Sequence, residues 1–220
     1  MEKVEVLIDS GNFYHLMLKK LGYQEVDFDY NKFADFLANG REIIQGGKRF
    51  YVGTVRDKQD AYESSRAVDN QKILFDGLRK TGWEIKTSKL RTRAETIKVD
   101  NRFLDFDKLV KCGIREITFE KSREKGIDVK ITVDLIIGAL DKKYDTAILV
   151  SSDTDLMAAI QCVRKRFHKK IEYIGFSLTE TPKFEATRPV KALIYESDIQ
   201  RVLADSDIRK FIRTQPAILP

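Results

Sequence analysis

The sequence predicts an α/β domain with a central, mainly parallel sheet. Short apolar runs that suit buried strands recur along the 220 residues, most clearly at 4–8, 147–150 and 170–174. Segments with apolar residues at helical spacing separate these runs. Because buried strands that alternate with helices form a parallel sheet covered on both faces, the order favours an α/β/α sandwich. No internal repeat, low-complexity tract or linker divides the chain, so we expect one domain over residues 1–220.

In the first half of the chain, turn residues mark the ends of the expected elements. The first strand stops at Asp9, and a helical pattern over 13–21 closes at Gly22. Gly46 and Gly47 predict a turn before the second strand. The remaining elements expected here are helices at 31–37 and 61–80 and strands at 50–55 and 83–87.

The middle of the chain is less regular. Residues 89–120 contain one expected strand, at 115–119, and we interpret the stretch as an insertion or a hairpin. Insertions near a cleft often determine which substrates can reach it. We therefore expect this segment to influence substrate shape.

In the second half, strands and helices alternate again. A helix is expected at 129–140, a strand at 147–150, a helix at 155–167, and a strand at 170–174 that ends at Gly175. A polar loop over 176–189 follows. The last expected elements are a short strand at 192–194 and a C-terminal helical extension from about residue 197.

The composition indicates a soluble protein with a basic surface. The chain has 40 Lys and Arg against 34 Asp and Glu, for a net charge of +6, which suits a polyanionic partner but equally a solvated surface. Cys112 and Cys162 lack the spacing of a zinc site or a disulfide framework. The first residues enter a strand without a leader, and no apolar run approaches the ~20 residues that span a bilayer. We therefore expect a cytoplasmic protein without membrane association.

Several aspartates lie where a parallel sheet binds its ligands. Asp9 follows the first strand, and Asp153 and Asp155 follow the strand at 147–150. The carboxyl ends of parallel strands share one edge of the sheet. Asp128 starts the helix at 129–140, and Asp134 lies further along it. Carboxylates gathered in one cleft repel each other unless a cation intervenes, and oxygen ligands suit Mg²⁺ or Mn²⁺ rather than zinc.

Each aspartate also has a structural interpretation. Asp9, Asp128, Asp153 and Asp155 precede or begin helices, where Asp commonly caps the first turn. Asp134 is either a supporting carboxylate or the partner of a lysine such as Lys130. Asn12 is placed to hydrogen-bond a carboxylate, a metal-bound water or a phosphate. Ser151 and Ser152 are placed either to cap a helix or to donate to phosphate oxygens.

Three segments that contain these aspartates resemble the signature blocks of the NYN domain, in its LabA-like branch. The segments are VLIDSGNFY, KGIDVKITVDLI and YDTAILVSSDTDLMAAI, and the resemblance covers roughly residues 4–175. NYN domains belong to the PIN-like nuclease superfamily, so the resemblance implies a Rossmann-like fold and metal-dependent RNA cleavage. It assigns the carboxylates of the family pattern to Asp9, with Asn12 as its companion, and to Asp128, Asp134, Asp153 and Asp155. This sequence matches the pattern at each of these positions.

Basic residues precede and follow the irregular segment. A site that cuts RNA needs cations to hold the phosphates that its own carboxylates repel. The residues that we expect to bind nucleic acid are Lys86, Lys89, Arg91, Arg93, Lys98 and Lys125. A second basic run, 164–170, ends a helix, where cations complement the helix dipole, so a structural role is favoured there.

The sequence as a whole favours a ribonuclease that hydrolyses single-stranded or structured RNA. Asp9, Asp128, Asp153 and Asp155 would be the catalytic residues and the ligands of Mg²⁺ or Mn²⁺, supported by Asn12, Asp134 and Ser152. The alternative is a non-catalytic, RNA-binding or regulatory module. A phosphatase is disfavoured because Asp9-Ser10-Gly11 lacks the second Asp of a DxD pair and no phosphate loop of the Walker type is present. A homodimer is left open.

Overall fold

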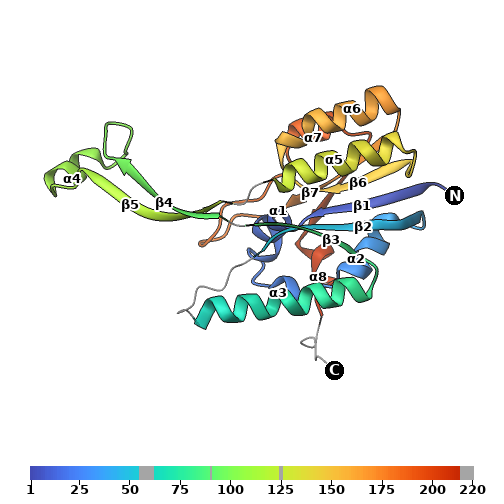
Figure 1. Cartoon of the computed structure of the whole chain (residues 1–220), viewed down its shortest axis with the longest axis horizontal. Coiled ribbons are helices and arrows are strands. Elements are labelled where there is room, and N and C mark those ends of the chain that lie inside the picture. Colours follow the sequence, from blue (N-terminus) through green and yellow to red (C-terminus); the bar gives the residue numbers. More distant parts are fainter. Residues whose placement is uncertain (55–61, 90, 124–125, 214–220) are drawn as a thin grey trace.

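The computed structural model describes residues 1–54, 62–89, 91–123 and 126–213, and its centre is a six-stranded parallel sheet (Figure 1). Every neighbouring pair of strands in this sheet is parallel. The strands, in spatial order, are β3 (Glu84–Lys89), β2 (Glu42–Thr54), β1 (Lys3–Asp9), β6 (Thr146–Val150), β7 (Lys170–Ser177) and β8 (Ile199–Ala204). The predicted fold class is therefore confirmed.

Helices cover both faces of the sheet (Figure 1). One face carries α5 (Ile127–Leu140), α6 (Met157–Phe167) and α7 (Lys191–Tyr195). The other face carries α1 (Ser10–Phe13), the π-helix η1 (Tyr14–Leu18), α2 (Tyr30–Ala38), α3 (Tyr62–Lys80) and α8 (Asp205–Arg209). Two 3-10 turns complete the domain, η2 (Glu25–Asp27) and η3 (Thr154–Leu156). Among the described helices, none is both long and apolar enough to cross a bilayer.

The residues of β1 explain why this strand lies at the centre of the sheet. Val4, Val6 and Ile8 pack into the core on the side of α1 and α2, whereas Leu7 packs on the side of α5 and α6. Successive side chains of a strand point to opposite faces, so apolar residues on both faces require cover on both. Phe13 then fixes α1 against the sheet, with its ring 5.2 Å from that of Phe176 in β7. This packing holds the turn after β1 in place.

The turn expected at Gly46 and Gly47 is absent, because these glycines lie inside β2. The pairing of β1 with β2 shifts between Val4, which pairs with Ile43, and Val6, which pairs with Lys48. Gly46 has a positive φ of 69°, a conformation that glycine adopts without steric strain. The two glycines therefore form a bulge within a longer strand.

The expectations for the C-terminal part were wrong in two places. The segment expected as a strand at 192–194 is helix α7, and the helix expected from about 197 is β8 followed by the short helix α8. Tertiary contacts explain the difference, since the Asp198 carboxylate accepts hydrogen bonds from Ile171 N and the Arg164 guanidinium. These bonds start β8 beside β7, which itself continues past Gly175 to Ser177.

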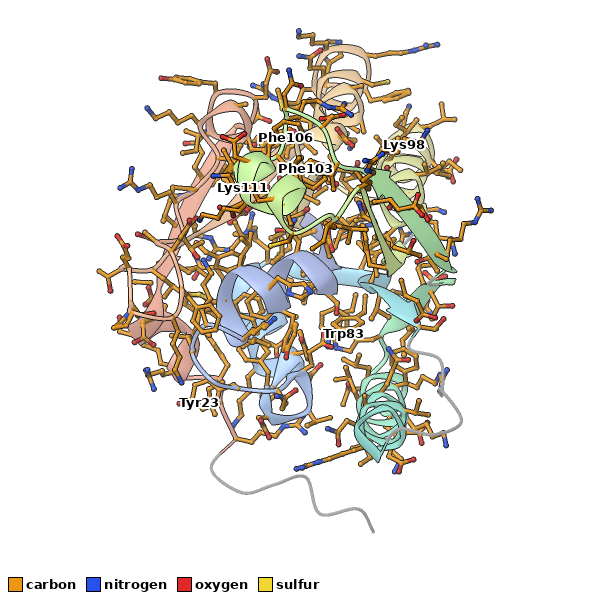
Figure 2. All side chains as sticks on the ribbon, turned by 90° about the vertical axis from the view of Figure 1, so that its left-hand side faces the viewer. Tyr23, Trp83, Lys98, Phe103, Phe106 and Lys111 are labelled. Atoms are coloured by element: carbon orange, nitrogen blue, oxygen red, sulfur yellow. The ribbon has the colours of Figure 1, made fainter. Side chains whose placement is uncertain are left out.

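The irregular middle segment forms a hairpin arm, made of β4 (Arg91–Lys98), α4 (Phe106–Lys111) and β5 (Glu116–Arg123). The arm projects from the domain on the side where the parallel strands end (Figure 1). Seen along its length, it carries Phe103, Phe106, Lys98 and Lys111 at its outer end (Figure 2). The predicted strand at 115–119 corresponds to β5. Strand β4 was missed because Ile97 is its one large apolar residue and its other side chains are charged or small.

Candidate active site

The site lies at the carboxyl ends of the two central strands, β1 and β6. The chain passes outward from β1 to β2 and β3, then returns to place β6 on the other side of β1. Ligands of open parallel sheets bind at such a switch in strand order. Ile8 pairs with Val150, so Asp9 and Ser151 follow directly at the same edge.

The Asp9 carboxylate joins the two strand ends. Its Oδ1 accepts a hydrogen bond from Asn12 N at 3.1 Å, which caps α1. Its Oδ2 accepts a hydrogen bond from the Ser151 hydroxyl at 3.0 Å. The expected capping role of Asp9 is thus confirmed, and the same carboxylate also holds the end of β6.

Further hydrogen bonds order the segment after β6. Ser152 N donates to Asn12 Oδ1 at 3.0 Å, and Asp153 N donates to Ser151 Oγ at 3.2 Å. The Asp153 carboxylate accepts a hydrogen bond from Asp155 N at 2.9 Å, and this bond caps η3. The backbone that carries Asp153 is therefore fixed relative to Asp9 by side chains from both strand ends.

An open cleft of about 520 Å³ brings three of the expected carboxylates together, those of Asp9, Asp128 and Asp153. Asn12 lines the same cleft. Asp128 is placed by the first turn of α5, after Gly126 with its positive φ of 87°. Within the described residues, no three His, Cys, Asp or Glu side chains are grouped closely enough to form a ready-made metal site. The donors suit a hard divalent cation in their chemistry and in their shared cleft.

Two of the expected acidic residues lie outside the lining of this cleft. Asp155 is exposed and contributes its backbone N–H to Asp153. Asp134 accepts a hydrogen bond from the Tyr51 hydroxyl at 2.7 Å and lies 4.0 Å from Lys86 Nζ. Its lysine partner is therefore Lys86. Lys130 donates to the carbonyl of Thr87 instead.

A cluster of buried polar side chains from β1 and β2 lies next to Asp134. Glu5 is fully buried, and one of its carboxyl oxygens is 3.4 Å from an Arg49 nitrogen. Burial raises the pKa of Glu5 to about 8, although Arg49 acts in the opposite direction. Burial, assisted by Asp134, also raises the pKa of Tyr51. Its hydroxyl therefore stays protonated and donates a hydrogen bond to Asp134.

One cleft residue was not expected from the sequence, namely His15. It lies three residues after Asn12, and both line the cleft. Spacing of three residues on a helix was the signal that could have found it. Burial, followed by the nearby Lys19, lowers the pKa of His15 from 6.5, so its neutral form is favoured.

The expected nucleic-acid-binding residues fall into three groups. Lys86 is partly buried and pairs with Glu84 at 2.6 Å, whereas Arg93 and Lys98 are exposed on β4 of the arm. Lys125 and the side chains of Lys89 and Arg91 lie outside the described residues. In the second basic run, the Arg164 guanidinium binds Asp198 at 2.9 Å, which agrees with the structural role expected there.

The register of the arm places like charges opposite each other. Arg93 of β4 pairs with Lys121 of β5, and paired residues share one face of a hairpin. Lys121 also lies 3.5 Å from Glu95, which offsets part of this charge. Like charges on directly opposite residues destabilise a hairpin. An anionic partner would relieve this repulsion.

Comparisons with known proteins identify the family of the chain and agree with its fold. The family model of the NYN domain matches residues 3–193. A solved structure of a protein of unknown function from Vibrio parahaemolyticus RIMD 2210633 is similar, with a TM-score of 0.55 and 22% sequence identity over 94% of this chain and 96% of that chain. At that identity the likeness concerns the fold. No curated protein matches the chain. Since the family model spans most of the sequence, the chain belongs to the NYN domain family.

Proposed function

We propose that the protein is a metal-dependent ribonuclease that hydrolyses RNA phosphodiester bonds in the cleft at the ends of β1 and β6. The observation that carries this proposal is that Asp9, Asp128 and Asp153, from three separate elements, line one open cleft. NYN domains have the PIN-like nuclease fold, which gives this arrangement a hydrolytic interpretation. A cytoplasmic location, as expected from the sequence, would suit an RNA substrate.

Asp9, Asp128 and Asp153 would hold Mg²⁺ or Mn²⁺, with Asp155 as a neighbouring carboxylate. A cation bound between these groups would offset their mutual repulsion. Such an ion supplies Lewis-acid activation of water and stabilises charge on phosphate oxygens. Both ions accept carboxylate oxygens as ligands.

The surrounding residues would orient the carboxylates. The Ser151 hydroxyl and Asn12 N fix the two oxygens of Asp9, and Asp155 N fixes Asp153. Carboxylates that are held by other groups lose less conformational entropy when they bind an ion. Arg93 and Lys98, on the side of the domain where the cleft opens, would bind phosphates of the RNA.

A second candidate function is a non-catalytic RNA-binding or regulatory module. The observation in its favour is that Asp9 and Asp153 already serve as helix caps. In addition, the described residues include no closely grouped triad of metal-binding side chains. In this alternative the acidic cleft would bind RNA-associated cations without turnover.

Replacement of Asp153 by Asn distinguishes the two functions. Asn still accepts the hydrogen bond from Asp155 N, so the cap and the fold should survive, while the ligand loses its charge. We expect cleavage of a labelled single-stranded RNA in Mn²⁺ or Mg²⁺ to fall by about 100-fold or more. Asp141→Asn, at the exposed end of α5, serves as the matched control and should cleave normally.

Two results would contradict the nuclease proposal. Cleavage by the wild-type protein that persists in a chelator would exclude a metal-dependent reaction, and full activity of Asp153→Asn would exclude this carboxylate. If the wild-type protein binds RNA but leaves it intact with every metal tested, the binding-module alternative is supported. Circular dichroism of each variant checks that the fold is retained.

A further inference from the structure

A second, smaller pocket lies beside the cleft, between η1, η2 and α3. Its volume is about 170 Å³, against about 520 Å³ for the cleft. Most of its lining side chains carry hydrogen-bonding groups, namely those of Tyr14, Gln24, Glu25, Asn70 and Gln71. We infer that this pocket binds one nucleobase of the RNA strand and gives the nuclease a base preference, an inference that rests on the proposed function.

The pocket and the cleft share the segment that follows β1. Tyr14 lines the pocket and the next residue, His15, lines the cleft, and their ring centroids are 5.3 Å apart. Ser10, which follows Asp9, donates its hydroxyl proton to Glu25 of the pocket. If an RNA strand binds with one phosphate near Asp9, a neighbouring base is therefore within reach of the pocket.

The lining favours a base over a phosphate. None of the described residues that line the pocket is Lys or Arg, whereas phosphate recognition in proteins relies on cations. The small volume suits one planar ring system rather than a whole nucleotide. Single-stranded RNA is read by aromatic side chains that stack on bases and by polar groups that bind their Watson–Crick edges. Tyr14, Asn70 and Glu25 supply both kinds of contact.

Two of these side chains are arranged for hydrogen bonding to a ligand. Asn70 makes no side-chain hydrogen bond to any residue in the described part of the chain, and it lines the pocket from α3. Glu25 uses Oε1 to accept from Ser10, and it lies 3.5 Å from the Tyr30 hydroxyl. The amide of Asn70 can donate and accept, which matches the mixed donor and acceptor edge of a base.

Binding measured without cleavage tests the inference. The Asp153→Asn protein is titrated with fluorescein-labelled single-stranded oligomers of A, C or U, and affinity is read by fluorescence anisotropy. We expect the tightest and weakest oligomers to differ by about tenfold or more in Kd, because bases differ in the hydrogen bonds that they offer. Adding Asn70→Ala should reduce this ratio to about threefold or less. Adding Asp69→Ala, an exposed neighbour on α3 outside the pocket lining, should leave the ratio unchanged.

The outcomes separate this inference from the proposed function. Equal affinity for the three oligomers, or an unchanged ratio after Asn70→Ala, overturns the base pocket even if the wild-type protein cleaves RNA. A third outcome is that Asn70→Ala removes base-selective binding while the wild-type protein cleaves no RNA with any metal. This outcome supports the base pocket and overturns the proposed nuclease activity. Absence of RNA binding by the Asp153→Asn protein overturns the base pocket, and the nuclease proposal is overturned as well if the wild-type protein neither binds nor cleaves RNA.

Discussion

The carboxyl group of Glu5 in β1 is buried beside the guanidinium of Arg49 in β2, and Glu5→Gln tests whether this carboxyl is ionised. Glu5 is fully buried and lies 3.4 Å from Arg49. Neither oxygen of Glu5 has a hydrogen-bond partner among the described residues, and the same holds for two Arg49 nitrogens. A buried pair without hydrogen bonds recovers only part of its desolvation energy. Burial therefore outweighs the attraction of Arg49 and raises the pKa of Glu5 to about 8.

The direction of the pH effect follows from this raised pKa. In the unfolded chain Glu5 releases its proton near the ordinary value of 4.5, whereas in the folded protein it keeps the proton until about pH 8. Between these values the folded state binds more protons, so the free energy of unfolding falls as the pH rises. One pKa unit corresponds to about 1.4 kcal/mol. Between pH 5 and 7, the wild-type protein should lose roughly 2–3 kcal/mol relative to Glu5→Gln, which has no proton to release.

Urea unfolding of both proteins at pH 5, 6, 7 and 8, followed by circular dichroism, measures this difference. Glu172→Gln provides the contrast, because buried Glu172 contacts Arg41 at 2.7 Å and Arg201 at 2.6 Å. Loss of its charge should destabilise the fold by about 3–5 kcal/mol at pH 7. If the wild-type protein and Glu5→Gln differ by the same amount at every pH, Glu5 is ionised throughout and the reasoning from burial is refuted.

Two further predictions concern packing and the arm. Gly138→Ala should destabilise the protein by about 1–3 kcal/mol, because a Cβ there would lie 2.7 Å from a buried tyrosine ring. Gly77→Ala, where a Cβ meets open space, should instead stabilise α3 by about 0.5–1 kcal/mol. Thermal unfolding measures both variants, and shifts of the unfolding temperature in the same direction would contradict this contrast. Replacement of Arg93 and Lys121 by Glu should weaken RNA binding about tenfold or more and reduce its salt dependence, relative to Lys80→Glu at the far end of α3. An unchanged salt slope in anisotropy titrations would exclude the arm from the interface.

Sequence patterns predicted the centre of the sheet better than its edge. Strands β1 and β6 are buried on both faces, and their apolar runs, interrupted in β1 by Glu5, located them to within about two residues. Strand β8 lies at the edge, and its six residues show neither an unbroken apolar run nor a regular alternation of polar and apolar residues. Its pairing depends on contacts such as that of Asp198 with Ile171 N, which no local pattern reveals. A short apolar segment such as 192–194 suits a helix or a strand equally.

The sequence predicted which aspartates converge better than it predicted their contacts. Asp9 and Asp153 follow neighbouring parallel strands, so topology alone brings them to one edge. Asp134 follows Asp128 by six positions, which turns its side chain by roughly 240° around an α-helix. It therefore lies next to Tyr51 rather than in the cleft. That difference could be seen from the sequence only if the start of α5 and its orientation on the sheet were already known.

The hairpin arm also has a consequence for how copies of this protein behave at high concentration. In the described part of the chain β4 and β5 pair only with each other, so each has an outer edge of backbone N–H and C=O groups that can accept a third strand. Such an edge is a template for aggregation by strand addition. Charged residues of both signs interrupt the two strands, and they include Arg93, Glu95, Lys98, Glu116, Glu120 and Lys121. A neutral strand that paired here would have to desolvate these charges, so the same residues that suit the arm for a charged partner also keep it from recruiting strands of other chains.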